Sequence, residues 1–150
     1  MYNLDIYFFI VILALILLAK MAFSDIKTRQ VRHRDLLCLT FLLICLWLKS
    51  PNVSVLPYTL MILGVGFLLH ILRVLGAGDT KLLCVISLGV SPQYLSLLLY
   101  GTVFVGGAFA VAYLLYGYTT DIQKIRARGV PYAVPIAMVG GPLILLTYIS

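Results

Sequence analysis

The chain has 150 residues, of which 63% are hydrophobic and only 11% are charged, and its mean hydropathy is +1.10. A composition this apolar excludes a soluble globular domain and indicates an integral membrane protein. The formal net charge of +6 would favour nucleic acid as a partner of a soluble protein. In a membrane protein such a charge orients the chain, so we expect a lipid bilayer and no nucleic acid.

Apolar segments separated by charged, Pro and Gly residues predict an all-α bundle of six transmembrane helices in a single domain over residues 1–150. The predicted helices cover 6–23, 36–48, 55–75, 82–90, 94–117 and 131–149. The first lacks a preceding basic residue and a following cleavage site, which predicts a permanent helix and not a signal peptide. The fourth is short, because residues 82–90 rise only about 14 Å against a hydrocarbon core of roughly 30 Å.

The distribution of positive charge tests this number of spans. Six spans put both termini on one side, and nearly all basic residues then fall on the other, which the positive-inside rule makes the cytoplasmic side. We therefore expect a multi-pass protein of the inner (plasma) membrane with both termini outside. The basic residues predicted inside are Lys20, Lys27, Arg29, Arg32, Arg34, Arg73, Lys81, Lys124, Arg126 and Arg128, with Lys49 alone outside.

Small residues within the predicted helices would let neighbouring helices approach closely. The three cysteines, Cys38, Cys45 and Cys84, lie in apolar segments at none of the spacings that zinc or redox sites use. No metal site, disulfide or organic cofactor is predicted. The small positions are Gly64, Gly66, Gly101, Gly106, Gly107, Ala110 and Ala112.

Two aspartates, Asp25 and Asp79, stand where apolar segments end on the predicted cytoplasmic side. A carboxylate at membrane depth costs roughly 2.5 to 3.5 kcal/mol, so it marks a functional site by default. Two aspartates that share one proton can hydrolyse a peptide, one activating water and the other polarising the scissile carbonyl. Gly76 and Gly78 would let the backbone turn sharply in a re-entrant loop before Asp79 and let substrate approach it.

From spacing alone, a second interpretation of the pair stays open. Asp25 and Asp79 would then be ordinary interfacial charges, Asp25 neutralised by Lys27 or Arg29 and Asp79 by Lys81. The basic segment 27–34 can anchor the topology or bind anionic lipid. His70 can be a proton relay or a hydrogen-bond partner of a neighbouring helix. The role of His33 stays undetermined. The roles of Asp35 and Asp121 stay undetermined as well, since a solvated charge and a contact to a basic peptide are both compatible with the sequence.

The two motifs resemble those of the type IV prepilin peptidases. Residues 24–31, Ser-Asp-Ile-Lys-Thr-Arg-Gln-Val, resemble the first aspartate motif of that family, and residues 76–83, Gly-Ala-Gly-Asp-Thr-Lys-Leu-Leu, resemble its Gly-x-Gly-Asp motif. Residues 128–135 are similar to the segment that opens the family's last helix. The resemblance implies a membrane aspartic endopeptidase that cuts the basic leader of prepilins or pseudopilins at the cytoplasmic face, with pilus assembly or secretion machinery as a possible partner.

By position, the resemblance makes Asp25 and Asp79 the catalytic pair, Gly76 and Gly78 the loop-forming glycines, and Lys27 and Lys81 flanking residues. It does not assign acid and base within the pair. The chain departs from the family where Arg32-His33 stands in place of a common Pro-Asn. It also lacks the paired Cys-x-x-Cys domain of longer relatives that methylates the new N-terminus, so cleavage without methylation is expected. This short form looks most like peptidases of tight-adherence (Flp) pili, and archaeal preflagellin peptidases are similarly minimal.

Three other interpretations compete with this one. Presenilin-like proteases share Gly-x-Gly-Asp but have a Tyr-Asp first motif and a Pro-Ala-Leu motif, whereas this chain has Ser24 before Asp25 and no Pro-Ala-Leu. A small proton- or cation-coupled transporter would place its acids near the membrane midplane. A non-catalytic pilus assembly protein would tolerate Asn at both aspartates.

Overall fold

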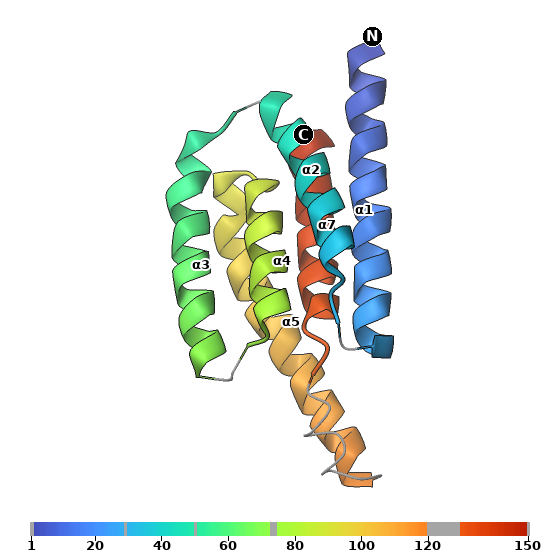
Figure 1. Ribbon diagram of the computed structural model, residues 1–150, viewed down its shortest axis with the longest axis vertical. Coiled ribbons are helices and arrows are strands. Elements are labelled where there is room, and N and C mark those ends of the chain that lie inside the picture. The colour runs from blue at the N-terminus through green and yellow to red at the C-terminus, as the bar shows by residue number, and fades with distance from the viewer. Residues whose placement is uncertain (1, 29, 50, 73–74, 120–129, 150) are drawn as a thin grey trace.

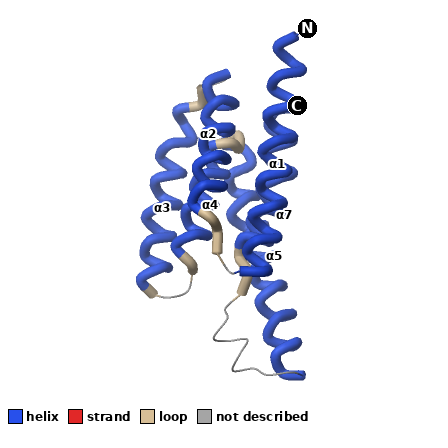
Figure 2. Tube along the Cα trace, turned by 45° about the vertical axis from the view of Figure 1, so that its right-hand side comes forward, coloured by secondary structure: helices blue, strands red, loops and turns tan. Residues whose placement is uncertain are grey.

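The computed structural model describes residues 2–28, 30–49, 51–72, 75–119 and 130–149. Within these ranges the chain forms α-helices and one short 3-10 helix and no strand, which confirms the predicted all-α class (Figure 2). The elements are α1 (Tyr2–Thr28), α2 (His33–Lys49), η1 (Val53–Val55), α3 (Leu56–Ile71), α4 (Ala77–Leu88), α5 (Pro92–Thr119) and α7 (Ala133–Ile149).

Successive helices run in alternating directions along one axis (Figure 1). The first helix, α1, packs against both α2 and α7, while α3 packs on α4 and α5 packs on α7. Helix α4 also contacts α2 and α7, so it occupies the middle of the bundle. Helix α1 begins and α7 ends at the same end of the bundle, as an even number of crossings requires (Figure 1).

Three helical segments are long and apolar enough to cross a membrane, namely Ile6–Thr28, Val53–Ile71 and Pro92–Tyr118. Large apolar side chains point outward from them, as in Phe104 of α5, which is 80% exposed. Such exposure would be costly in water but is ordinary for a helix that faces lipid. The molecule is therefore an all-α polytopic membrane protein.

The fourth helix is longer than expected and begins earlier. The sequence predicts a start at Leu82, where the apolar run begins, but α4 starts at Ala77 and has 12 residues, a rise of about 18 Å. Asp79 therefore lies in the first helical turn, not in a re-entrant loop. A carboxylate is favourable at that position because the helix N-terminus carries partial positive charge. Polar residues that hydropathy assigns to a loop are here the start of the helix.

Only some of the small residues bring helices together. A Cβ on Gly101 would lie 2.8 Å from a Val139 methyl group, and one on Gly140 would lie 2.7 Å from a methyl group of Ile86. These glycines allow α7 to pack tightly on α5 and α4. Gly64 and Gly107 differ, because a Cβ on either would meet nothing within 4 Å. Their missing side chains leave open space on α3 and α5.

Candidate active site

Asp25 lies in the last turns of α1 and is buried, with only 6% of its surface exposed. Its Oδ2 accepts a hydrogen bond of 3.1 Å from the backbone N–H of Ala133. Ala133 is the first residue of α7, where backbone N–H groups have no partner within the helix. A carboxylate from the first helix of the chain thus supplies the acceptor that the last helix needs, and the bond fixes its position.

Asp79 is the third residue of α4, and Gly76 is the residue that precedes the helix. Gly76 has φ −70° and ψ 143°, a conformation open to any residue, so the expected sharp turn is wrong. The reason for a glycine is space: a Cβ on Gly76 would lie 2.6 Å from Oδ2 of Asp79. The carboxylate folds back over Gly76, and any side chain there would displace it.

Gly78 is helical, since α4 begins at Ala77, and it does not form a loop as predicted. A Cβ at Gly78 would lie 3.5 Å from the Cβ of Val31, a residue in the segment between α1 and α2. The segment that follows Asp25 therefore packs against the helix that carries Asp79. Both aspartates lie at the same end of the bundle, as expected, on separate helices.

The two flanking lysines sit at this end as well. Lys27 is exposed in the last turn of α1, and Lys81 is exposed on α4, two residues after Asp79. Their positions add positive charge around the two aspartates without filling the space between helices.

Thr80 is a residue that the sequence analysis did not identify. It is 5% exposed, and its hydroxyl donates to the carbonyl oxygens of Gly66 and Gly76, each at 3.3 Å. Its side chain occupies the space beside Gly66, so Thr80 packs directly against the α3 backbone there. Because Thr80 follows Asp79 directly, this contact fixes the start of α4.

Gly66→Ala is therefore expected to destabilise the protein by about 1 to 3 kcal/mol, since the new methyl group overlaps the Thr80 side chain. Thr80→Ser removes the overlapping methyl group and keeps the hydroxyl. The double variant Gly66→Ala/Thr80→Ser should regain most of the loss, as measured by thermal unfolding in detergent. Equal stability of the double and the Gly66→Ala variants would contradict this packing.

Asp35, whose role the sequence left undetermined, is buried in the first turn of α2 and forms an ion pair with Lys20 of α1. The Lys20 Nζ to Asp35 Oδ1 distance is 2.6 Å. This pair joins α1 to α2, so Asp35 acts as a structural link. His33 is an exposed residue at the start of α2, and Asp121 lies outside the described residues.

His70 is exposed near the end of α3, and its Nδ1 lies 3.2 Å from the carbonyl oxygen of Leu75. The contact connects the end of α3 to the residue before Gly76. His70 thus has a local contact just beyond the end of its own helix, and not the expected bond to a neighbouring helix.

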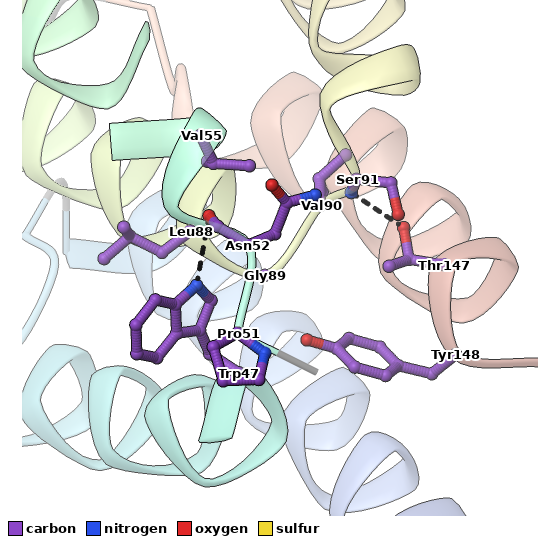
Figure 3. A pocket seen from close by; sticks show the side chains of 10 residues that line it. All are labelled: Trp47, Pro51, Asn52, Val55, Leu88, Gly89, Val90, Ser91, Thr147 and Tyr148. Atoms are coloured by element: carbon purple, nitrogen blue, oxygen red, sulfur yellow. Dashed lines mark hydrogen bonds between the residues drawn. The ribbon is translucent and has the colours of Figure 1, made fainter. Parts of the chain in front are cut away.

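One cavity lies at the opposite end of the bundle, where α2 and α4 end and α5 begins (Figure 3). Its volume is about 370 Å³. Trp47 donates there to the carbonyl of Asn52, and the N–H of Ser91 donates to the Thr147 hydroxyl. Among the described residues that line it there is no Asp, Glu, Lys, Arg or His, and both aspartates are at the other end, so it is not the candidate active site.

Over residues 10–111 the sequence matches the type IV leader peptidase family, and this range contains both aspartates and both glycines of the site. The chain belongs to the type IV leader peptidase family. Searches of curated proteins and of solved structures gave no match. As a type IV leader peptidase, the protein is a membrane peptidase whose substrates are prepilins in general. Membership favours the peptidase over the transporter and the non-catalytic assembly protein.

Proposed function

We propose that this type IV leader peptidase is an aspartic endopeptidase of the Gly-x-Gly-Asp type, with Asp25 and Asp79 as its catalytic pair. It cuts the basic leader of prepilins or pseudopilins at the cytoplasmic face of the inner membrane. The observation that carries the proposal is the bond between the Asp25 carboxylate and the Ala133 N–H. That bond holds a buried carboxylate at the end of the bundle where the second aspartate begins α4.

The chemistry needs one ionised and one protonated carboxylate, sharing a single proton between them. The ionised one takes a proton from water, whose oxygen attacks the scissile carbonyl carbon while the protonated one donates to the carbonyl oxygen. The tetrahedral intermediate then collapses, the C–N bond breaks, and the departing nitrogen receives a proton. Acid and base roles within the pair stay unassigned.

Two helix N-termini support negative charge at this site. Asp25 accepts from the first N–H of α7, and Asp79 lies in the first turn of α4. The partial positive charge of each helix N-terminus stabilises an anion nearby. Such an arrangement supports the ionised member of the pair that the mechanism requires.

The cytoplasmic orientation follows from the positive-inside rule. Lys27, Arg32, Arg34 and Lys81 are exposed at or near the end of the bundle that carries the aspartates. The leader meets the site from that side, and its apolar continuation stays in the bilayer. These 150 residues contain no Cys-x-x-Cys pair, so we expect them to cleave without methylating the new N-terminus, as in the tight-adherence pilus type.

Co-expression with a test prepilin tests the proposal. Wild type should remove the leader, seen as a gel shift, whereas Asp25→Asn and Asp79→Asn should not, at equal amounts in the membrane. Arg34→Gln, a change of an exposed residue at the start of α2 and at the same end of the bundle, serves as the control and should still cleave. Cleavage by both Asn variants would exclude the aspartate pair as the catalytic machinery.

A further inference from the structure

Most backbone N–H groups in the first turn of α7 are used locally. The N–H of Val134 donates to the carbonyl of Pro131 at 3.3 Å, and the N–H of Ile136 donates to the carbonyl of Tyr132 at 3.2 Å. Pro135, between them, has no N–H to donate. A helix start leaves four such groups without partners inside the helix. Three of these four positions are therefore accounted for by proline or by the residues just before the helix.

The fourth group, the N–H of Ala133, donates to Asp25. Both residues are buried. Helix α7 itself, Ala133–Ile149, has no charged side chain, so it acts on Asp25 through this N–H and through the partial positive charge of its N-terminus. A donor to a carboxylate favours the ionised form. The place of Ala133 therefore matters for the protonation of Asp25 as well as for its position.

The ring of Tyr132 holds this end of α7 against α5. A Cβ on Gly106 would lie 3.2 Å from Cε1 and 3.4 Å from Cδ1 of Tyr132. The ring thus packs on the α5 backbone at a glycine, and a side chain there would crowd it. Tyr132 directly precedes Ala133, and its carbonyl accepts the N–H of Ile136 in α7. A shift of the ring is therefore passed on to the Ala133 N–H.

This contact is separate from a second one between the same two helices. Gly101 of α5 receives Val139 of α7, where a Cβ on the glycine would lie 2.8 Å from a methyl group. Val139 lies about 9 Å further along α7 than Ala133. The Gly101 contact thus joins α5 to α7 independently of Tyr132. What the ring adds is the place of the first turn of α7 beside Asp25.

We propose that Tyr132 is a positioning residue of this peptidase. Its ring, seated against Gly106, holds the Ala133 N–H at the Asp25 carboxylate, so a contact between α5 and α7 sets the working state of an acid on α1. The effect of Tyr132 on the reaction is carried by Ala133. This inference rests on the proposed function and adds what keeps one member of the aspartate pair in place and ionisable.

The positioning role predicts the direction of a pH effect. The two aspartates titrate as a unit, so a change at Asp25 moves both ionisations of the pair. An ionised carboxylate that loses a donor is protonated more readily, so both limbs of the bell-shaped profile move to higher pH. The other charged or titratable side chains described at this end of the surrounding helices are kept in every Tyr132 and glycine variant below. They are Lys20 and Lys27 on α1, Arg32, His33, Arg34 and Asp35 on or beside α2, and Asp79 and Lys81 on α4.

Tyr132→Ala removes the ring, whereas Tyr132→Phe keeps the carbon atoms that meet Gly106. With purified enzyme and a test prepilin, Tyr132→Ala should lower kcat at the wild-type pH optimum at least about ten-fold, because a misplaced catalytic group is costly, with little change in KM. Its pH profile should lie at higher pH. Tyr132→Phe should restore the wild-type rate and profile. A slower enzyme with an unmoved profile, or no rescue by Phe, would overturn the proposal.

Substitutions on α5 reach the same group from the other side. Gly106→Val crowds the ring and should move the pH profile in the same direction as Tyr132→Ala. Gly107→Val is the matched control, because a Cβ on this neighbouring glycine meets nothing within 4 Å, and its profile should match wild type. Gly101→Ala presses on Val139 and should lower Tm without moving the profile. An equal pH shift in either control would contradict a specific role for Tyr132.

A measurement without substrate separates this inference from the proposed function. Tyr132→Ala should lower Tm less in an Asp25→Ala background than in wild type, because the bond that the ring positions is already lost. Equal losses in the two backgrounds would overturn the positioning of Ala133, whether or not the protein cuts prepilins. If the losses differ but wild type cuts no prepilin, the peptidase function is overturned and with it the catalytic role of Tyr132, while the contact itself stands.

Discussion

Asn in place of Asp25 or of Asp79 is expected to slow leader cleavage by about 10⁴-fold, because the one carboxylate that remains cannot act as both the base and the acid. The double variant should be within a few-fold of the slower single variant, since the residues act as one unit. Initial rates on a purified test prepilin measure this. Losses that multiply in the double variant would contradict a shared mechanism.

Asn is the informative substitution at position 25 because its side-chain oxygen can still accept the Ala133 N–H. Asp25→Asn should therefore insert and unfold like wild type. Asp25→Ala removes the acceptor, leaves a buried N–H without a partner, and should cost about 1 to 3 kcal/mol of stability. Comparison of thermal unfolding for the two variants separates the catalytic role of the carboxylate from its structural role.

Lys20→Met is expected to lower the free energy of unfolding by about 2 kcal/mol, because it leaves the buried Asp35 carboxylate without its cation. The full cost of breaking a buried pair is larger, but the Lys20 side chain is 57% exposed, so solvent screens part of the attraction. For a chain of this size the change corresponds to a fall in Tm of about 4 to 8 °C, measurable in detergent.

The two ends of this ion pair should not be equivalent. Asp35→Asn leaves a lysine that is already largely hydrated, so it should cost less than Lys20→Met. Adding Asp35→Asn to Lys20→Met should restore part of the lost stability, because no buried charge then remains. A larger cost for Asp35→Asn than for Lys20→Met would refute this assignment.

Hydropathy predicted the existence of each helix but not its polar ends. The apolar segment 6–23 stops where Ser24 begins, whereas α1 continues to Thr28 and takes Asp25 with it. Helix α1 can continue past the apolar segment because a helix needs only backbone hydrogen bonds. A tertiary hydrogen bond then offsets the cost of burying the Asp25 carboxylate. That partner, the Ala133 N–H, is a backbone group far along the chain and leaves no pattern in the sequence.

The roles of the glycines in the second motif were likewise not predictable from the sequence. A glycine before an aspartate suggests backbone freedom, but Gly76 has an ordinary φ and is needed because the Asp79 carboxylate occupies the space beside it. Likewise, nothing in the sequence distinguishes Gly107, which borders a cavity, from Gly101, which packs against Val139. Such differences depend on which side chains other helices bring to each position.

The bond from Asp25 to Ala133 also bears on how the enzyme is made. A membrane protein is inserted from its N-terminus, so α1 and α4 bring both aspartates into the bilayer before α7 has been synthesised. The family-matched range ends at residue 111, ahead of α7. If Asp25 acts as proposed, a nascent chain that already carries both acids still lacks the N–H group that holds one of them in place. Completion of the site is thereby tied to the synthesis of α7.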